Sequence, residues 1–480
     1  MRVHWHRSDI RASDNQGLAA AAESEDEGEG EALPVFVFDP DVMDHGSPPR
    51  MAFLLDALAS LRETYRERGS DLLVTRGDPA EELPRLVAEY DAAGVTWNQD
   101  YSGLAVERDR RVREALADAD SEYETFHDAV HHEPGSITTN NGDPYSVFSY
   151  FGEKWLDREK EDPYPEPDGD DLAEVETGAE GTNELPTLEE LGFTEPDSDL
   201  PDAGTEAARE RLESFCAEDI YEYGERRDFP AEERTSRLSQ DIHYGTIGVR
   251  EVYERTAEAM EEADSEEAEE SVEAYQEELA WSEFFTQVLY YNPNVVHENY
   301  RGFENGIEWR EDEAELDTWK AGETGYPIVD AGMRQLQRES YMHNRLRMIV
   351  ASFLTKDLML DWRAGYDHFR TRLVDHDTGN DNGGWQWAGS TGTDAQPYFR
   401  VFNPMKQGSD YDAECEYITE YVPELEGVDP DVIHSWHELD EAEREDHAPD
   451  YPAPIVDHDE RREEAIAMYE RARGEDEDDD

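Results

Sequence analysis

The first 128 residues contain five short runs typical of β-strands: VHWH (3–6), VFVF (35–38), LLVT (72–75), VTWN (95–98) and YETF (123–126). Segments with helical periodicity, such as residues 51 to 68, separate these runs. Alternating strands and helices require crossover connections and therefore a parallel sheet. The sequence thus predicts a doubly wound α/β domain at the N-terminus.

Between the first helix and the second strand lies the acidic segment ESEDEGEGE (23–31). Its Gly28-x-Gly30 spacing is similar to part of a dinucleotide-binding loop. Such a loop follows a strand and offers free N–H groups to an anion, whereas this one follows a helix and lies among carboxylates. We interpret it as a solvated loop.

The composition changes twice along the chain. Residues 131 to 205 are rich in Pro, Gly, Asp and Glu, which predicts a long connector. Beyond residue 206, helical patterns dominate, and the clearest span residues 207–215, 272–291, 331–339 and 343–360. We therefore expect an α/β domain (1–130), a connector (131–205), an all-α domain (206–472) and an acidic tail (473–480).

The overall charge is extreme, with 121 acidic against 42 basic residues and a net charge of −79. The acidity covers the whole chain, and only five of the basic residues are lysines. Molar salt shortens the Debye length to about 3 Å and would screen this repulsion. We infer adaptation to a very salty cytoplasm, and the 10% of aromatic residues argues against a disordered protein.

The sequence contains neither a recognisable targeting segment nor a pattern of cysteines. The N-terminus lacks an apolar signal core, and charged residues interrupt the most apolar stretch, residues 348 to 360. Only Cys216 and Cys415 are present, which indicates no disulfide framework. We expect a soluble cytoplasmic protein, and a monomer.

Residues 331 to 410 differ from the rest of the chain in charge, because they contain ten basic and nine acidic residues. Such a local change of charge is typical of a surface that meets an anion, either a nucleic acid or a phosphate-bearing cofactor. Six of the ten tryptophans also lie between residues 281 and 387, two of them in the segment GGWQW (383–387). For any one tryptophan, burial in the core is the simpler interpretation.

Several segments resemble the flavin domain of the photolyase/cryptochrome family and occur in that family's order. They read TSRLS (235–239), TGYPIVDAGMRQL (324–336), MHNRLRM (342–348), FLTKDL (353–358), DWR (361–363) and NGGWQWAGSTGTDAQPYFR (382–400). At the N-terminus, HRSDIR (6–11) and Asp14-Asn15 are similar to the family's antenna domain. The resemblance covers almost the whole chain.

The resemblance implies a folded FAD within the helical domain. Arg347 and Asp375 resemble the family's ion pair beside the flavin ring, where a guanidinium can hold a carboxylate in fixed geometry. Hydroxyl groups at the predicted helix start near Thr235 suit a pyrophosphate, although a simple N-cap is the alternative. The implied FAD-binding residues are Tyr223, Thr235, Ser236, Arg237, Leu238, Ser239, Tyr275, Arg347, Asp375, His376, Asp377 and Asp381.

The resemblance also implies that the substrate is UV-damaged DNA whose pyrimidine dimer is flipped into a pocket. Glu278 and Trp281 are three residues apart and share one helical face, which suits a hydrogen bond beside a stacking surface. Trp387 would supply a second aromatic wall. The implied DNA or substrate residues are Arg227, Glu278, Trp281, Asn344, Arg345, Met348, Trp387 and Gln407.

In the family, light excites reduced FAD, an electron splits the dimer and then returns, so no nucleophile is required. Trp309, Trp362 and Trp385 match the family's electron relay to the flavin, and Glu278 and Asp381 match further functional positions. An antenna chromophore is expected near residues 98 to 109. The pattern there leaves open a deazaflavin of the F420 type or methenyltetrahydrofolate.

Two departures affect the expected activity. Relatives that repair (6-4) photoproducts have paired histidines where this chain has His343-Asn344, so Asn344 favours cyclobutane dimers. Asp381 stands at the position facing flavin N5, commonly Asn in bacterial photolyases and Asp in plant cryptochromes. A carboxyl group there could donate a proton, so a cryptochrome-type photoreceptor is the main alternative. A further departure is Ser282, where many photolyases have Arg.

Two other classes compete with the enzyme. In a non-catalytic nucleic-acid-binding protein, the aromatic residues would only stack on bases. In a metal hydrolase, His127, His131 and His132 would be ligands, but no structured ligand spacing emerges. We expect no metal site, and we expect repair because the substrate residues are kept and the long tail usual in cryptochromes is missing from the sequence.

Overall fold

The computed structural model describes residues 1–23, 31–175 and 183–474. The loop around Gly28 and Gly30 and residues 475–480 of the expected tail lie outside this range. The chain forms two compact units: unit 1 comprises Met1–Pro196, Leu200–Gly224 and Thr235–Pro293, and unit 2 comprises Asp197–Asp199, Glu225–Arg234 and Asn294–Asp480. The domain boundaries expected from the sequence stay a prediction.

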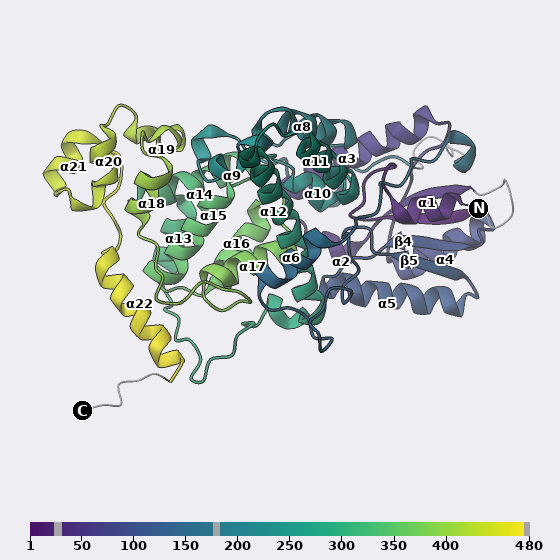
Figure 1. Cartoon of the computed structure of the whole chain (residues 1–480). Helices are drawn as coiled ribbons and strands as arrows, with labels where there is room; N and C mark the ends of the chain where they lie inside the picture. Colours follow the sequence, from purple (N-terminus) through teal and green to yellow (C-terminus); the bar gives the residue numbers. More distant parts are fainter. Residues whose placement is uncertain (24–30, 176–182, 475–480) are drawn as a thin grey trace. The chain divides into compact units, whose positions relative to one another are not determined.

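Unit 1 begins with a five-stranded sheet of order β3-β2-β1-β4-β5. Figure 1 labels two of its strands, β4 and β5. All neighbouring strands are parallel. The strands are β1 (Arg2–His6), β2 (Ala32–Phe38), β3 (Leu73–Arg76), β4 (Gly94–Asn98) and β5 (Glu122–Phe126). Each predicted run overlaps one of them, which confirms the α/β sheet. The strand order reverses between β1 and β4, the point where such folds commonly place polar functional residues.

Strand β2 is buried on both of its faces. Successive side chains of a strand point to opposite faces. Val35 and Val37 pack in the core that contains Leu83 of α4, whereas Phe36 and Phe38 pack in the core that contains residues of α3. The covering helices are α1 (Gln16–Ala22), α2 (Pro40–Met43), α3 (Pro48–Glu67), α4 (Pro79–Tyr90) and α5 (Gly103–Asp118). A continuous apolar run is therefore typical of this buried parallel strand.

The connector contains little regular structure, and the chain then becomes helical. Within the connector lie α6 (Phe148–Asp157) and α7 (Leu188–Leu191). The helices that follow are α8 (Thr205–Ala217), α9 (Tyr223–Arg226), α10 (Ser239–Tyr244), α11 (Val249–Glu262) and α12 (Glu266–Tyr291). Figure 1 shows α6 beside the long helix α12.

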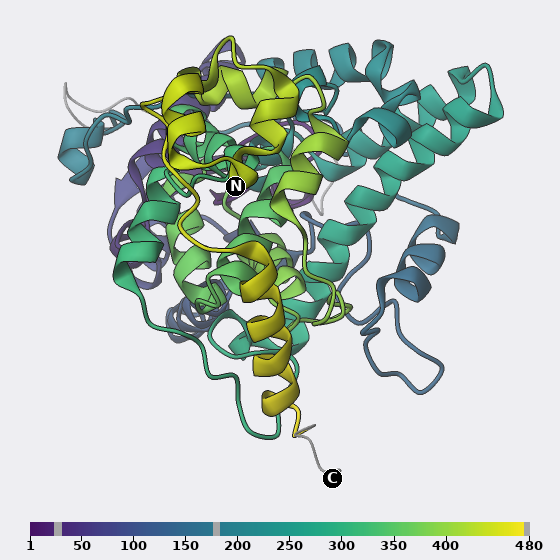
Figure 2. The same ribbon diagram turned by 90° about the vertical axis from the view of Figure 1, so that its left-hand side faces the viewer.

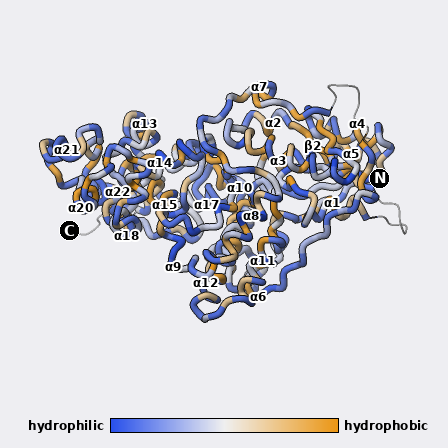
Figure 3. Tube along the Cα trace, turned by 90° about the horizontal axis from the view of Figure 1, so that it is seen from above, coloured by the Kyte–Doolittle hydropathy of each residue, from blue (hydrophilic) through white to orange (hydrophobic). Residues whose placement is uncertain are grey.

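Unit 2 is helical in its described residues. Its main helices are α13 (Glu313–Ala321), α14 (Pro327–Glu339), α15 (Asn344–Ser352), α16 (Trp362–Arg372), α17 (Thr378–Ala388), α18 (Pro404–Tyr411), α19 (Glu416–Tyr421), α20 (Pro430–His434), α21 (Glu441–His447) and α22 (His458–Ala472). The last, α22, is the yellow helix that leads to the C-terminus in Figure 2. Apolar residues recur among hydrophilic ones along the helices of both units (Figure 3), as amphipathic packing requires. These helices confirm the predicted all-α character of the second half.

One predicted helix differs from the structure. The pattern at residues 343–360 predicts a single helix, but α15 ends at Ser352 and Phe353–Asp357 forms a π-helical turn. Met359 then takes a positive φ of 52°. Thr355 donates its hydroxyl hydrogen bond to the carbonyl of Ala351, a bond that competes with regular helix geometry. Among the described residues, no helix is long and apolar enough to cross a membrane.

Candidate functional site

Three of the residues expected to bind FAD meet in unit 1. The ring of Tyr275 on α12 lies edge-on to that of Tyr223, with 5.3 Å between centroids. Its hydroxyl donates a hydrogen bond to Ser236 Oγ at 3.1 Å. Phe215 closes the group, 4.8 Å from Tyr275. Burial raises the pKa of Tyr275, so its hydroxyl remains a hydrogen-bond donor.

The segment from Thr235 to Ser239 runs directly into α10. Leu238 is the N-cap residue and makes no side-chain capping bond, so the structure does not support the simple N-cap interpretation of Thr235 and Ser236. Arg237 has a φ of +51°, the left-handed region that non-glycine residues rarely adopt. Such conformations persist where the surrounding structure holds them and cluster at binding sites.

Glu278 and Trp281 lie on α12, as their spacing predicts. Trp281 is half-buried, and Phe148 of α6 stacks on its ring with 3.7 Å between centroids and 10° between planes. Phe284 and Phe285 contact the same indole. One face of Trp281 is therefore covered by protein, and the ring is held rigidly. A rigid indole is a suitable wall for a stacked base.

In unit 2, the predicted ion pair is present. Arg347 Nη2 lies 2.6 Å from Asp375 Oδ2, and Arg347 Nη1 lies 3.5 Å from Asp381 Oδ1. His376 Nδ1 lies 2.6 Å from Asp381 Oδ2. Burial alone would lower the pKa of Arg347, but Asp375 and Asp381 raise it. The structure thus brings together four of the expected FAD-binding residues, and the fifth, Asp377, caps α17 by accepting from Asn380 N at 2.7 Å.

Two features of unit 2 fit a bound flavin. The Asp375 side chain is fully buried, and its Oδ1 has no hydrogen-bond partner among the described residues. A buried acceptor left unpaired costs free energy, which a ring N–H of a flavin would recover. Asp381 and Gly384 are one turn apart on α17, and a Cβ atom at Gly384 would meet nothing within 4 Å. This side of α17 can therefore approach a flat ring closely.

The expected DNA residues of α15 are partly engaged within the protein. Arg345 Nη2 lies 2.5 Å from Asp228 Oδ2, and the guanidinium stacks over the Tyr411 ring at 4.2 Å. Asn344 is exposed and Met348 is half-buried. Arg345 would therefore have to leave Asp228 or share its charge in order to contact a phosphate. Arg227 directly precedes Asp228, so the segment that pairs with Arg345 also carries the other predicted arginine.

The remaining two substrate residues lie on α17 and α18. Trp387 is half-buried and packs against Phe402, with 6.3 Å between ring centroids. Gln407 is half-buried, and its Oε1 has no hydrogen-bond partner among the residues that the structure describes. An unsatisfied amide oxygen on a half-buried side chain can accept a hydrogen bond from a bound group.

Two of the three relay tryptophans are buried. Trp385 packs against α16 so closely that a Cβ at Gly365 would lie 2.0 Å from its ring. Trp362 is the first residue of α16 and donates its Nε1–H to Asn299 Oδ1 at 2.9 Å. Trp309 is half-buried beside Tyr469, 6.0 Å between centroids. Adjacent helices α16 and α17 thus carry Trp362 and Trp385, respectively.

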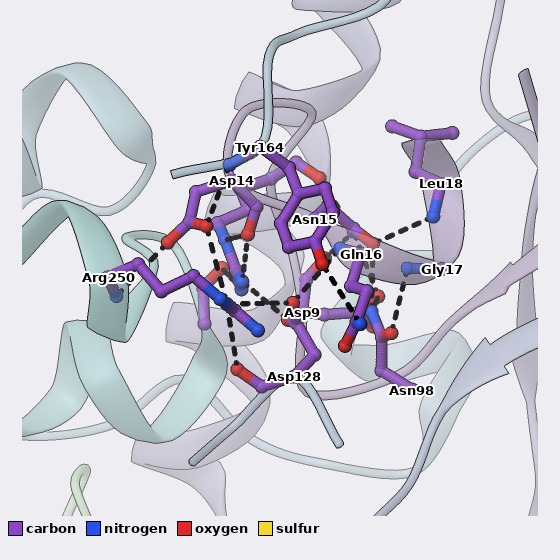
Figure 4. Close-up of polar contacts among 12 residues, drawn as sticks. Asp9, Asp14, Asn15, Gln16, Gly17, Leu18, Asn98, Asp128, Tyr164 and Arg250 are labelled. Carbon is purple, nitrogen blue, oxygen red and sulfur yellow. Dashed lines mark hydrogen bonds and ion pairs between the residues drawn. The ribbon is translucent and has the colours of Figure 1, made fainter. Parts of the chain in front are cut away.

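The segment HRSDIR (6–11) and the pair Asp14-Asn15, which follow β1, have a structural role in unit 1. Figure 4 shows Arg250 of α11 between Asp14 and Asp128, at 3.3 and 3.2 Å. Tyr164 of the connector donates its backbone N–H to Asp14 at 3.2 Å. Burial raises the pKa of Asp14, although Arg11 and Arg250 oppose this shift. The motif therefore joins the sheet to α11 and to the connector.

The histidines considered as metal ligands do not form a ligand set. Burial lowers the pKa of His131 to about 3 and that of His132 to about 4, so both are neutral. His127 instead shares a hydrogen bond with Tyr101, at 2.9 Å. In the described ranges, the three side chains that lie closest for a metal are His4, His6 and Asp9. Their ring nitrogens are satisfied within the protein: Nδ1 of His4 by Thr96 Oγ1, Nε2 of His4 by Asp9 Oδ2, Nδ1 of His6 by the carbonyl of Asp9, and Nε2 of His6 by Tyr65 Oη.

The expected site residues divide between the two units. Unit 1 contains Tyr223, Thr235 to Ser239, Tyr275, Glu278 and Trp281, whereas unit 2 contains the others. Three contacts of these residues were not predicted from sequence patterns: Phe148 on Trp281, Asp228 on Arg345 and Trp319 on Trp385. Phe148 lies in an aromatic stretch of the connector, and this composition is the only signal that could have pointed to it.

Two family descriptions match the sequence. "DNA photolyase" matches residues 2–168, and "FAD binding domain of DNA photolyase" matches residues 275–471. The deoxyribodipyrimidine photo-lyase of Halobacterium salinarum is 60% identical over 480 residues, which cover 99% of this chain and 100% of the relative. The chain therefore belongs to the DNA photolyase family, as the resemblance in its motifs predicted, and it carries that family's FAD-binding domain.

Solved structures agree with this assignment. A bacterial class III photolyase from Agrobacterium tumefaciens has a TM-score of 0.89 and 32% identity, covering 98% of this chain and 97% of that one. An archaeal photolyase from Sulfolobus tokodaii with two FAD molecules has a TM-score of 0.81 and 30% identity, covering 98% and 99%. Sequence and fold thus match photolyases along nearly the whole chain.

Proposed function

We propose that the protein is a deoxyribodipyrimidine photo-lyase, a lyase that repairs cyclobutane pyrimidine dimers in DNA under light with FAD as its cofactor. The observation that carries the proposal is the Arg347–Asp375 pair, in which the buried Asp375 keeps an unpaired Oδ1, in a chain 60% identical to the Halobacterium salinarum photo-lyase. Reduced FAD, when bound, supplies the electron that light drives to the dimer. Both bonds that join the two pyrimidines break, the electron returns, and the net reaction is redox-neutral.

The residues of this chain bind and orient the two partners. Arg347, Asp375, His376, Asp377 and Asp381 would hold FAD from unit 2. Tyr223, Tyr275 and the segment from Thr235 to Ser239 would hold it from unit 1. Arg347 fixes Asp375 through a charge-assisted bond, so the unpaired Oδ1 can accept from the cofactor in a set direction.

Substrate selection rests on stacking and hydrogen bonding. A cross-linked dimer stacks poorly in the duplex, so flipping it out costs less than flipping an intact base. Trp281, Trp387 and Met348 would line the pocket, Glu278 and Asn344 would bond the dimer, and Arg227, Arg345 and Gln407 would contact DNA. Asn344, in place of a second histidine, favours cyclobutane dimers over (6-4) photoproducts.

Three further parts of the proposal concern the relay, the antenna and the cellular setting. Trp385, Trp362 and Trp309 would carry an electron to oxidised flavin, and residues 98 to 109 would contact a second chromophore, a deazaflavin or a folate. The relative from Sulfolobus tokodaii has two FAD molecules, which supports a second chromophore as such. We also propose a cytoplasmic monomer that works at high salt.

The test is repair of a duplex with one thymine dimer, at high salt, under blue light and in darkness. Loss of dimers only in the lit arm is expected. Equal dimer counts in both arms would refute repair and favour the photoreceptor, for which Asp381 is the specific observation. Purified protein that retains no flavin would instead favour a non-catalytic nucleic-acid-binding protein.

A further inference from the structure

The indole N–H of Trp362 has a neutral hydrogen-bond acceptor. Trp362 is fully buried in unit 2, and its Nε1–H donates to Asn299 Oδ1 at 2.9 Å. Arg363 Nη2 donates to the same oxygen at 3.4 Å. Indole and guanidinium N–H groups can only donate, so the Asn299 amide must face both of them with its oxygen. An amide oxygen accepts a hydrogen bond but takes no proton at neutral pH.

The carboxylate next to Trp362 in the sequence is engaged by the same arginine. Asp361 caps α16, and its two oxygens lie 2.9 and 3.0 Å from Arg363 Nη1. The Arg363 guanidinium also lies 4.7 Å from the centre of the Trp362 ring. A cation so close to the ring disfavours a second positive charge on it. Trp362 is therefore held between a cation and a neutral amide.

The other two tryptophans of the proposed relay have different surroundings. Trp385 is buried, and its Nε1 has no hydrogen-bond partner among the described residues. Trp309 is half-buried and packs against the core cluster that contains Trp362 and Trp385. Its segment also pairs with the segment before Trp362, through a parallel bridge between Arg310 and Leu360. Of the three tryptophans, Trp309 is thus the one that is not fully buried.

These surroundings matter because oxidation turns an indole into an acid. A tryptophan that gives up one electron becomes a radical cation, and its N–H is far more acidic than that of the neutral ring. If a base takes this proton, the neutral radical that remains is a poorer oxidant of the next tryptophan. An intermediate member of a relay must therefore keep its proton, whereas the last member can lose it.

We propose that Asn299 keeps Trp362 protonated while Trp362 carries the positive charge, so that the charge moves on to Trp309. One electron passes from Trp385 to the flavin, one from Trp362 to Trp385, and one from Trp309 to Trp362. Trp309 then loses its indole proton to water, and an external thiol gives it back one electron and one proton. Asn299 is a positioning residue, since it acts through Trp362. This inference rests on the relay in the proposed function.

The experiment follows tryptophan radicals by transient absorption after a light pulse, because the radical cation and the neutral radical have different spectra. In the flavin-loaded full chain with Trp309→Phe, the charge should stop at Trp362 and remain a radical cation until it recombines. With Asn299→Asp added, a carboxylate of ordinary pKa about 3.9 faces the indole and should take its proton, so the neutral radical should appear. Asn299→Gln in the same background keeps an amide and should give only the radical cation.

Asn403→Asp, again combined with Trp309→Phe, is the matched control. It adds the same charge to unit 2, and a carboxylate caps α18 as well as the amide that accepts from Lys406 N at 2.9 Å. This variant should give only the radical cation. The proposal is overturned by a neutral radical in Trp309→Phe alone, or by its absence after Asn299→Asp is added in protein with the flavin content of the parent.

A second readout needs no flavin. In protein with isotope-labelled tryptophan, the indole N–H resonance of Trp362, assigned with Trp362→Phe, reports the hydrogen bond. Asn299→Ala should shift this resonance, whereas Asn305→Ala should not, because the Asn305 amide donates to the Arg471 carbonyl at 2.8 Å instead. An unmoved resonance in Asn299→Ala would contradict the proposal.

The outcomes separate this inference from the proposed function. A parent protein that forms no tryptophan radical after the pulse refutes the relay, and the role of Asn299 with it. Repair of the thymine dimer is scored separately. A protein that repairs dimers, but forms the neutral radical in Trp309→Phe alone, refutes only the role of Asn299.

Discussion

His376 Nδ1 lies 2.6 Å from Asp381 Oδ2, and both side chains are buried in unit 2. Arg347 lies 3.5 Å from the other oxygen of Asp381. Each of the two carboxyl oxygens of Asp381 therefore has a polar partner within 3.5 Å. Asp381, the residue whose identity favours the photoreceptor, therefore contacts both Arg347 and His376. A carboxyl group that only donated a proton to the flavin would not need these two partners.

The first prediction concerns this pair. His376→Ala leaves one buried oxygen of Asp381 without a partner, so the free energy of unfolding should fall by about 1–3 kcal/mol. His376→Gln retains a donor and should lose less. Denaturant unfolding at one fixed salt concentration measures both. Equal losses in the two variants would mean that packing, and not the hydrogen bond, stabilises this position.

The second prediction concerns FAD retention. Asp375→Asn removes the charge that Arg347 holds, and a hydrogen bond to a charged group contributes about 1.5–3 kcal/mol, so FAD affinity should fall at least ten-fold. The ratio of flavin to protein absorbance after gel filtration measures this. Arg338→Gln is the matched control, because the side chain of this exposed arginine lies 3.6 Å from Glu420 and 5.5 Å from the centre of the Tyr421 ring, neither of which is an expected cofactor residue. Full flavin content in Asp375→Asn would remove the residue from the cofactor site.

The third prediction concerns the tryptophan relay. Trp309→Phe and Trp362→Phe should each abolish most of the light-driven reduction of oxidised flavin while leaving flavin content unchanged, because an oxidisable ring is lost from the path. Trp436→Phe is the control, since this tryptophan is buried and its Nε1–H donates to the Pro452 carbonyl. Absorbance of the flavin under steady blue light, with an external reductant, follows the reaction. Unchanged photoreduction in both relay variants would end the relay hypothesis.

The fourth prediction concerns pH and Glu283 of α12. Its carboxylate accepts the backbone N–H groups of His131 at 2.8 Å and His132 at 3.2 Å. Burial raises the pKa of Glu283 to about 7, although these bonds and the nearby Lys160 oppose the shift. The folded protein therefore binds the proton more tightly than the unfolded chain does. This contribution is fully present below the unfolded pKa and is lost as pH rises through about 7.

Between acid and neutral pH, the titration of Glu283 should thus lower the free energy of unfolding by up to about 3 kcal/mol. Glu283→Gln removes the titrating group and should flatten this part of the pH profile, even though the amide fits its two N–H partners less well. Urea unfolding at a series of pH values and constant salt gives the slope. A variant with the slope of the parent would show that other groups cause it.

Sequence patterns sufficed where local periodicity and composition carry the information. The run at residues 35–38 found β2 because a parallel strand buried on both faces is apolar over its whole length, whereas the edge strand β5 is largely exposed and contains Glu122 and Glu124. The helices near residues 207–215 and 272–291 followed from their amphipathic spacing. The same kind of reasoning failed at residues 353–357, where the π-helical turn depends on the buried surroundings of Thr355, Lys356 and Asp357.

The sequence by itself determined the class of fold, the acidic surface and the family, since these depend on residue order and composition. Only the tertiary structure decided that His376 bonds Asp381, that Phe148 covers one face of Trp281, and that Asp228 already pairs with Arg345. The last two pairs join segments far apart in the sequence, whose meeting depends on the packing of whole helices, whereas the contact of His376 with Asp381 depends on how the chain enters α17.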